Sequence, residues 1–281
     1  MNRFENLQEF IDLTDLPDEQ IDLAKTALFI ASVEYPDLDI EKQLGLLDSL
    51  ARVAARRIGD DTDPLARVNR LTEYLFDEVG FSGNQDDYYN PGNSLLNDVL
   101  ARRVGIPITL CLICIEVGRR VGIPLVAIGM PGHLLIRHQE IEGWFIDPFN
   151  GGILISKDEC AQRLMEISEN RVRWNSSYLA PIGNREFVAR MLRNLKGIYL
   201  DHKDYPRALD MLDRLVIIHP KAEQELRDRG VVHYRLERYE DALDDFESYL
   251  DCSAPGQDTR SVEKLVGQIR QSLGKESLRG R

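Results

Sequence analysis

The stretch of residues 93–150, NSLLNDVLARRVGIPITLCLICIEVGRRVGIPLVAIGMPGHLLIRHQEIEGWFIDPFN, decides the fold. It contains the phrase RRVGIP twice, at residues 102–107 and at residues 119–124. Each copy is typical of a helix end, because paired arginines complement the negative end of the helix dipole, glycine adopts the left-handed cap and proline follows. We therefore expect a helix that Asn93 caps and that runs to about Val104, and then a second, apolar helix that ends at the second copy.

Short strands are expected after the second copy, because the sequence there is apolar or alternates. They are predicted at residues 125–130, 133–137 and 143–147. His133 begins one of these strands and Asp147 ends another. His138 is expected in an exposed loop, and a helix rich in Leu, Met and Ile follows near residues 157–168.

The chain before this stretch predicts helices over its first 80 residues. Apolar residues recur there at intervals of three and four, which marks one face of a helix. Two such groups are Leu44, Leu47, Leu50 and Ala54, and then Val68, Leu71, Leu75 and Val79. Residues 81–92 are rich in Gly, Asn, Asp and Pro, so they are predicted to form a loop.

Composition excludes several classes of protein. The chain has 281 residues, of which 43% are apolar and 29% are charged, so a sizeable core is expected. Its net charge is −12, and residues 1–50 hold 12 acids against 3 bases, which argues against nucleic-acid binding. Neither a membrane-spanning run nor a signal region is evident, so we expect a cytoplasmic protein without membrane contact.

Four cysteines are present, and we expect them to be reduced. Cys111 and Cys114 have CxxC spacing but lie inside the apolar helix, where a free cysteine behaves as a small hydrophobic residue. Redox and metal roles remain alternatives, although no second Cys or His pair lies near enough in sequence for zinc. We predict neither a metal nor a cofactor.

The C-terminal part holds a repeat with a period of 34 residues. Residues 205–212 align with residues 239–246, and Gly230 and Tyr234 precede the second copy at helical spacing. This pattern resembles a pair of tetratricopeptide repeats, each of which is two packed helices, and residues 258–273 would be the capping helix that such arrays require. A protein or peptide partner is expected in the repeat groove, near Tyr199, Tyr205 and Tyr234.

Residues 93–150 resemble the core of the transglutaminase-like superfamily, which is related to papain. The run from Asp87 through NSLLNDVL, GIPITL and Pro131-Gly-His133 is similar to the bacterial SirB-one family, whose members carry such a core followed by tetratricopeptide repeats. In active members of the superfamily a cysteine opens the apolar helix, a histidine follows on a strand, and an aspartate follows on the next strand. His133 and Asp147 match the last two positions.

The cysteine nucleophile of active members has no counterpart at the expected position. The resemblance implies a cysteine about four helical turns before Gly122, at Pro107, Ile108 or Thr109, and none of these is a cysteine. Cys111 would lie roughly 3–6 Å deeper along the helix, where burial raises the pKa of a thiol. Thr109 is nearer to the expected turn, but threonine at a helix start is more often a cap.

The remaining polar residues of this stretch have more than one interpretation. His133 and Asp147 are either a catalytic pair, a remnant that binds a ligand, or a hydrogen bond that ties two strands together. Asn93 and Asn97 are candidates to line the cleft or to tie the loop. Glu116 lies inside the apolar helix, so if it is buried it needs a partner such as Arg119, Arg120 or His133.

The sequence therefore predicts an α+β fold with an all-α tetratricopeptide-like unit. The expected divisions are a helical N-terminal section at 1–92, a transglutaminase-like core at 93–180, a repeat pair at 185–255, and a capping helix and tail at 256–281. The predicted function is a non-catalytic or degenerate transglutaminase-like protein that binds a partner through its repeats. The alternatives are a thiol-dependent amidohydrolase or acyl transferase that uses Cys111, His133 and Asp147, and a purely structural adaptor.

Overall fold

The computed structural model describes residues 3–279, apart from the side chains of residues 3, 4, 257, 272 and 274–279. Residues 1–2 of the predicted N-terminal section and residues 280–281 of the predicted tail lie outside the described residues. The chain divides into two compact units, which we call the core unit, ending at Met191, and the repeat unit, beginning at Leu192.

The core unit opens with helical elements, three of which begin at a capping aspartate. These elements are α1 (Arg3–Thr14), η1 (Asp18–Gln20), α2 (Leu23–Ala31), α3 (Ile40–Ile58), α4 (Pro64–Thr72) and the π-helical η2 (Glu73–Glu78). Asp22, Asp39 and Asp63 each accept a hydrogen bond from a backbone N–H three residues later. Each cap satisfies an N–H group that the first turn of a helix leaves unpaired.

The segment that leads to the apolar helix contains four short elements. They are β1 (Ser82–Gly83), η3 (Pro91–Asn93), α5 (Leu96–Arg102) and β2 (Val104–Gly105), with β1 and β2 paired in parallel. The prediction that Asn93 caps α5 is wrong: Leu95 is the N-cap, because Asn93 ends a 3-10 turn instead. The left-handed residue after α5 is Arg103, with φ of 61°, rather than Gly105. A Cβ at Gly105 would lie 2.8 Å from Oγ1 of Thr109, so glycine is needed there for close packing.

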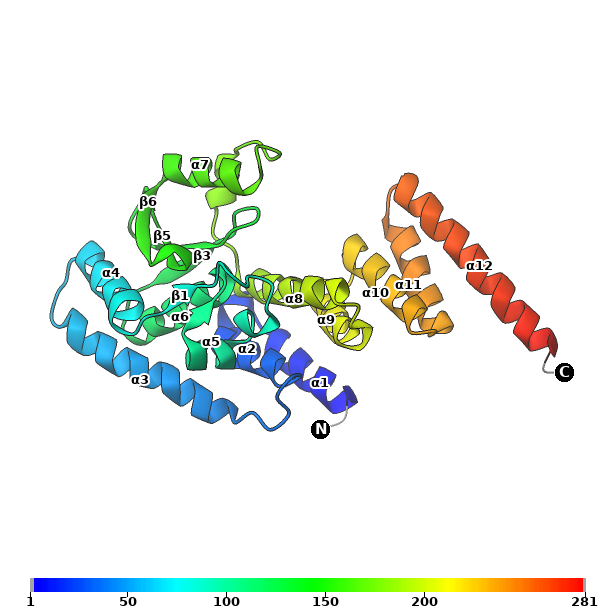
Figure 1. Ribbon diagram of the computed structural model, residues 1–281, viewed down its shortest axis with the longest axis horizontal. Helices are drawn as coiled ribbons and strands as arrows, with labels where there is room; N and C mark the ends of the chain where they lie inside the picture. Colours follow the sequence, from blue (N-terminus) through cyan, green and yellow to red (C-terminus); the bar gives the residue numbers. More distant parts are fainter. Residues whose placement is uncertain (1–2, 280–281) are drawn as a thin grey trace. The chain divides into compact units, whose positions relative to one another are not determined.

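An apolar helix and a four-stranded antiparallel sheet form the centre of the core unit (Figure 1). They comprise α6 (Pro107–Arg120), β3 (Leu125–Ile128), β4 (Leu135–His138), β5 (Trp144–Asp147), η4 (Pro148–Asn150) and β6 (Ile153–Ser156), with the strands in sequence order. Gly122 adopts the predicted left-handed conformation after α6, with φ of 70°. The sequence missed β6, and it was wrong about His138, which is buried in β4 and accepts a hydrogen bond from the N–H of Glu140.

Both faces of the sheet are covered. Helix α6 packs on one face, where Leu125 meets the position that a Cβ of Gly118 would occupy. On the other face lie α7 (Lys157–Ile167) and residues 172–179, which include η5 (Ser176–Leu179). The core on that side contains Ile128, Met130, Leu135, Phe145, Ile155, Cys160 and Leu164. The sheet therefore holds the ends of β4 and β5 between two apolar layers.

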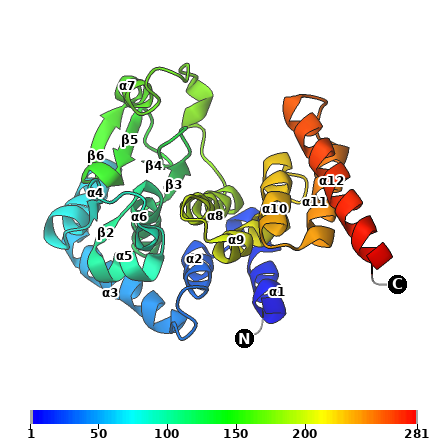
Figure 2. The same cartoon turned by 45° about the vertical axis from the view of Figure 1, so that its right-hand side comes forward.

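The repeat unit contains successive helices, as a repeat pair with a capping helix requires (Figure 2). They are α8 (Asn184–Asp201), which the boundary between the units divides, α9 (Tyr205–Ile218), α10 (Glu223–Arg235), α11 (Tyr239–Cys252) and α12 (Gln257–Arg279). Gly230 lets α10 and α11 approach, because a Cβ there would lie 2.6 Å from the ring of Phe246. Leu226, Ala242, Phe246, Tyr249, Val262, Val266 and Ile269 form the core of this unit.

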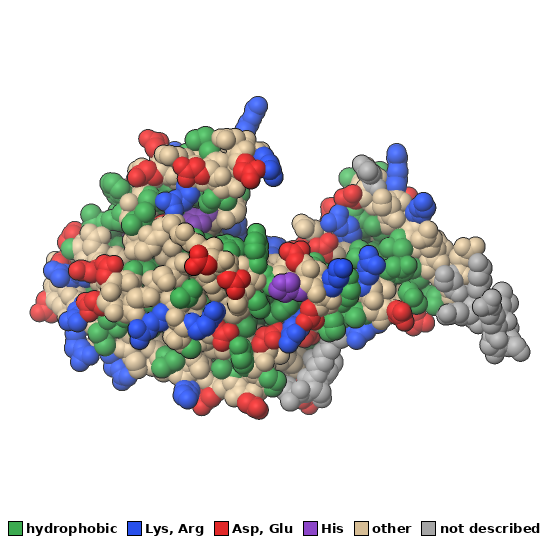
Figure 3. All heavy atoms as spheres, viewed as in Figure 1, with side chains coloured by type: hydrophobic (Ala, Val, Ile, Leu, Met, Phe, Trp, Pro, Cys, Tyr) green, Lys and Arg blue, Asp and Glu red, His purple; other side chains and the backbone are tan. Residues whose placement is uncertain are grey.

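The surface carries charges of both signs. Acidic and basic side chains are interspersed over the described part of the face in Figure 3. Among the described residues, no helix is long and apolar enough to cross a membrane.

Candidate functional site

The structure brings His133 and Asp147 together. His133 follows a turn in which Gly132 has φ of 72°, and Asp147 is the last residue of β5. The distance from Nε2 of His133 to Oδ2 of Asp147 is 3.1 Å. The side chain of Asp147 is fully buried and His133 is 8% exposed. A buried carboxylate in this position fixes the orientation of the imidazole, as the resemblance to active members implies.

Two further residues bind the same carboxylate. Arg163, which projects from α7, forms an ion pair with Oδ2 of Asp147. Nδ2 of Asn150 donates a hydrogen bond of 2.9 Å to Oδ2. Burial favours the neutral acid, but the hydrogen bonds from His133 and Asn150 and the charge of Arg163 outweigh it, so the pKa of Asp147 lies below its ordinary value. Arg163 and Asn150 were not predicted as site residues.

Aromatic rings surround the imidazole. The ring of Phe149 packs edge to face on His133, with 6.3 Å between centroids, and Tyr88 packs on Phe149 at 5.9 Å. Burial raises the pKa of the Tyr88 hydroxyl. Gly83 makes room for this cluster, because a Cβ there would lie 2.5 Å from the carbonyl oxygen of Phe149. The imidazole is therefore held on one side by a carboxylate and on another by rings.

Asn93 fixes the loop that carries Tyr88. It is fully buried, and its Nδ2 donates hydrogen bonds to the carbonyl oxygens of Asp87, at 2.7 Å, and Tyr88, at 3.2 Å. Asn97 is 8% exposed, and its Nδ2 bonds to Oδ1 of Asp98. Its Oδ1 has no hydrogen-bond partner within the described part of the chain. Asn93 thus fixes the backbone of the loop that carries Tyr88.

The first turn of α6 presents no thiol. Pro107 is its first residue, and the buried hydroxyl of Thr109 donates a hydrogen bond of 2.7 Å to the carbonyl oxygen of Asn93. The same hydroxyl accepts a hydrogen bond from the N–H of Ile106, at 3.2 Å. Both roles of the Thr109 hydroxyl are used in joining α6 to the preceding chain.

Cys111 lies one turn deeper. Its side chain is fully buried, and its Sγ donates to the carbonyl oxygen of Leu134 at 3.5 Å. Burial raises the pKa of the Cys111 thiol well above its ordinary value, and the charges of Cys114 and Asp147 raise it further. Because the thiolate is the nucleophilic form, this environment opposes nucleophilic chemistry at Cys111.

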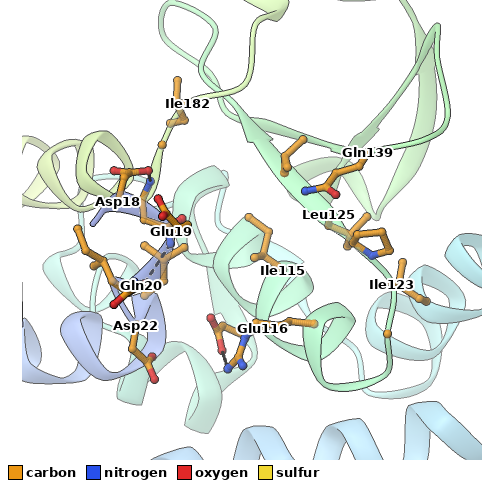
Figure 4. Close-up of a pocket in the computed structure, with 18 residues that line it drawn as sticks. Asp18, Glu19, Gln20, Asp22, Ile115, Glu116, Ile123, Leu125, Gln139 and Ile182 are labelled. Carbon is orange, nitrogen blue, oxygen red and sulfur yellow. Dashed lines mark hydrogen bonds and ion pairs between the residues drawn. The ribbon is translucent and has the colours of Figure 1, made fainter. Parts of the chain in front are cut away.

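Glu116 lies near the C-terminal end of α6. Its carboxylate is buried and pairs with Arg119, at 2.9 Å, and with Arg120. Arg120 also bonds to Asp48, at 2.7 Å, so the pair is joined to α3. Glu116 lines a cavity between η1, α6 and β3 (Figure 4), and His133 does not line this cavity.

The three tyrosines predicted to bind a partner differ in exposure. Tyr199 is 4% exposed, so its side chain fills the interior and we leave it out of any binding surface. Tyr205 and Tyr234 are half-buried. Tyr234 packs edge to face on Tyr239, with 5.8 Å between centroids. Tyr205 and Tyr234 therefore remain candidates for contact with a partner.

The cysteines are free, and Cys252 alone among the four is exposed. Burial raises the pKa of Cys160 to about 12 and keeps the pKa of Cys114 well above its ordinary value. No group of three or more His, Cys, Asp and Glu side chains in the described ranges is placed to hold a metal ion.

Comparison with known proteins extends the likeness over both units. The transglutaminase-like superfamily matches residues 41–193, and a tetratricopeptide repeat family matches residues 195–267. A UPF0162 protein of Xylella fastidiosa (strain Temecula1) is 36% identical over 268 residues, which is 92% of this chain and 92% of its own. No solved structure matches the chain.

Two more distant relatives differ in how much of their own length is matched. A Salmonella typhimurium protein named SirB1 is 25% identical over 232 residues, 78% of this chain and 81% of its own. F-box only protein 21 of Pongo abelii is 27% identical over 202 residues, which is 68% of this chain but 32% of its own. The chain thus spans most of the bacterial relatives and a third of the F-box protein.

Proposed function

Because this chain belongs to the SirB-one family of the transglutaminase-like superfamily, we propose that it is a transglutaminase-like scaffold that lacks the thiol chemistry of active members and binds a protein partner through its repeats. The core unit then serves as a folded support, and the repeat unit provides the binding surface. Repeat surfaces of this kind are extended and suit a peptide or a helix.

The start of α6 carries this proposal. The resemblance implies a cysteine at Pro107, Ile108 or Thr109 in the first turn of α6, and none of these three residues carries a thiol. The hydroxyl of Thr109 donates a hydrogen bond to the carbonyl oxygen of Asn93 and accepts one from the N–H of Ile106. These two hydrogen bonds oppose its use as a nucleophile. The pKa of Cys111 is raised, so the thiol form predominates near neutral pH.

The remaining polar cluster has a structural use that needs no nucleophile. Asp147 joins the turn before β4, through His133, to α7, through Arg163. Asn150 closes the same cluster from η4. With three partners, the buried carboxylate of Asp147 has its hydrogen-bond acceptors paired, and it joins the sheet to α7.

One observation favours the alternative of a thiol-dependent amidohydrolase or acyl transferase. The His133–Asp147 distance of 3.1 Å is that of a working imidazole–carboxylate pair. This alternative requires the Cys111 thiol to leave the carbonyl oxygen of Leu134 and to reach the imidazole. It therefore predicts that loss of His133 alters the reactivity of Cys111.

The repeat unit offers a place to test partner binding. Val231, on α10, is 39% exposed, which is high for a large aliphatic side chain, and Tyr234 lies one turn further along the same helix. A photo-crosslinking amino acid at position 231 of the full chain should capture a specific protein in cells. The same group at Glu240, an exposed residue at the start of α11, is the matched control.

The core-unit variant Cys111→Ala with His133→Ala separates the scaffold from the enzyme. Under the proposal, the crosslink at position 231 keeps its yield in this double variant and is lost with Tyr234→Ala. A crosslink that disappears in the double variant, while circular dichroism shows an intact fold, would contradict a scaffold role independent of the thiol. Equal capture from positions 231 and 240 would contradict a specific repeat surface.

A further inference from the structure

A cavity of about 760 Å³ lies in the core unit, and His133 is not among the residues that line it. It is bounded by η1 and the start of α2, by the C-terminal half of α6, and by the start of β3 (Figure 4). Its volume lies within the roughly 300–1,000 Å³ of ligand sites.

One wall of the cavity is an edge of the sheet. β3 is the first strand in the order β3-β4-β5-β6, so its outer side has no partner strand within the sheet. The N–H of Gln139 donates to the carbonyl oxygen of Pro124, at 3.0 Å, and Leu125 lies opposite His138 in the register. Backbone groups in an antiparallel ladder alternate between the two sides, so those of Leu125 point away from β4.

The chain covers part of this edge and then leaves it. The N–H of Ile182 donates to the carbonyl oxygen of Ala127, at 2.9 Å. Residues 184 and 185 then turn into α8, where their N–H groups donate to the carboxylate of Asp18, each at 2.8 Å. The length of edge at Leu125 therefore faces the cavity rather than a neighbouring strand. An unpaired strand edge is a template for an added strand.

The side chains around the cavity combine apolar and acidic groups. The aliphatic ones are Ile21, Leu23, Ile115, Ile123, Leu125, Val126 and Ile182. The acidic ones are Asp18, Glu19, Asp22 and Glu116, against the single base Arg119. Ile115 comes from α6, Ile182 from the segment before α8 and Glu19 from η1, and all three line the cavity (Figure 4).

Glu19 is the acid available to an incoming cation. Asp18 and Asp22 cap helices, and Glu116 pairs with Arg119. Glu19 is exposed and forms no ion pair within residues 3–279 as far as their side chains are described. The charge of the lining thus favours a basic occupant.

We propose that this cavity binds an extended, basic segment of a protein partner, which adds as a strand to β3 at Leu125. The backbone of the segment hydrogen-bonds to the N–H and C=O of Leu125. An aliphatic side chain packs on Ile115 and Ile182, and a lysine or arginine pairs with Glu19. The residues of this surface belong to the core unit and not to the repeat unit. Binding at this surface can therefore be tested separately from the partner binding that we propose for the repeats.

The test uses the full chain and a fluorescein-labelled heptapeptide of alternating valine and lysine. Fluorescence anisotropy at about 0.15 M salt measures its dissociation constant. Two matched probes replace lysine by glutamate, or carry N-methyl groups on the backbone of the central residues. Because N-methylation removes donors to the strand edge, it should weaken binding about five- to tenfold, and the glutamate probe should not bind.

Two variants locate the site. Glu19→Lys should weaken binding of the lysine probe about two- to fivefold. Glu41→Lys reverses an exposed acid in the first turn of α3, outside the cavity, and should leave the dissociation constant unchanged. Hydrogen–deuterium exchange should slow at residues 122–128 when the lysine probe binds, because the amide of Leu125 becomes paired.

Three results would overturn the proposal. The first is no saturable binding of the lysine probe. The second is equal binding of the N-methylated probe, or of acetyl-lysine amide alone, which would indicate a site for a small cation. The third is an equal effect of Glu19→Lys and Glu41→Lys, which would indicate general attraction to an acidic surface.

Discussion

At the scale of single residues, Asp147 is the group on which the core site depends. It is fully buried and holds His133, Asn150 and Arg163 at once. These contacts favour its charged form, which is why the pKa of its carboxyl is low in spite of burial. Loss of the charge should therefore cost stability as well as the orientation of the imidazole.

We expect Asp147→Asn to lower the free energy of unfolding of the core unit by about 2–3 kcal/mol at neutral pH. A carboxyl with a lowered folded pKa stabilises above its unfolded pKa of about 3.9, and that stabilisation is lost as pH falls through the folded value. The deficit of the variant should thus be constant above about pH 5 and narrow below pH 4.

Tryptophan fluorescence in urea measures this deficit, because both tryptophans, Trp144 and Trp174, lie in the core unit. Asp37→Asn, which changes an exposed aspartate, is the control and should shift the midpoint little. A deficit for Asp147→Asn that persists unchanged to pH 3 would show that lost packing, and not lost charge, is responsible.

At the scale of elements, the start of α6 depends on Thr109, one of the three positions at which the resemblance implies a cysteine. The hydroxyl of Thr109 joins the backbone of Asn93 to that of Ile106. Thr109→Val keeps the shape but leaves both groups unpaired in a buried place, so it should cost about 2–3 kcal/mol by urea unfolding. Thr109→Ser keeps the hydroxyl and should cost clearly less; equal losses would deny that the hydroxyl caps the helix.

Close packing of α10 on α11 is the corresponding feature of the repeat unit. Gly230→Ala would bring a Cβ to 2.6 Å from the ring of Phe246, which lies in the core. We expect a loss of about 1–3 kcal/mol, read from far-ultraviolet circular dichroism in urea. Gly267→Ala, where a Cβ meets nothing within 4 Å, should be neutral or slightly stabilising. A stabilised Gly230→Ala variant would contradict this packing.

At the scale of the whole molecule, the negative net charge argues against nucleic acid as a partner. With a net charge of −12 the chain should not bind a DNA duplex at about 0.15 M salt, because such binding needs basic groups that displace counterions. Anisotropy of a labelled duplex measures this. Saturable binding that weakens steeply with salt would reveal a basic surface that the net charge conceals.

Much of the fold was predictable from local sequence. The repeated RRVGIP phrase predicted the ends of two helices, and the 34-residue period predicted the repeat pair; the α+β fold with its tetratricopeptide-like unit is confirmed. The strand β6 was missed because it is four residues long and begins with an exposed isoleucine after two glycines. Asn93 was misplaced because its side chain bonds to the preceding loop, which capping rules do not consider.

The site was predictable only in part. A histidine and an aspartate at strand ends were visible in the sequence, and the structure places them in contact. Arg163 was not, because it reaches Asp147 from α7, sixteen residues away, and a lone arginine on a helix gives no signal. The cavity at β3 was also invisible, since it depends on where residues 181–184 leave the edge of the sheet.

If no activated thiol lies beside His133, the rate of alkylation of Cys111 as a function of pH will show it. Mass spectrometry of the full chain under limiting iodoacetamide, from pH 6 to pH 9, compares Cys111 with the exposed Cys252. We expect Cys252 to react far faster throughout, and His133→Ala to leave the rate at Cys111 unchanged. Preferential labelling of Cys111 that reaches a plateau near neutral pH, and that His133→Ala abolishes, would contradict this expectation.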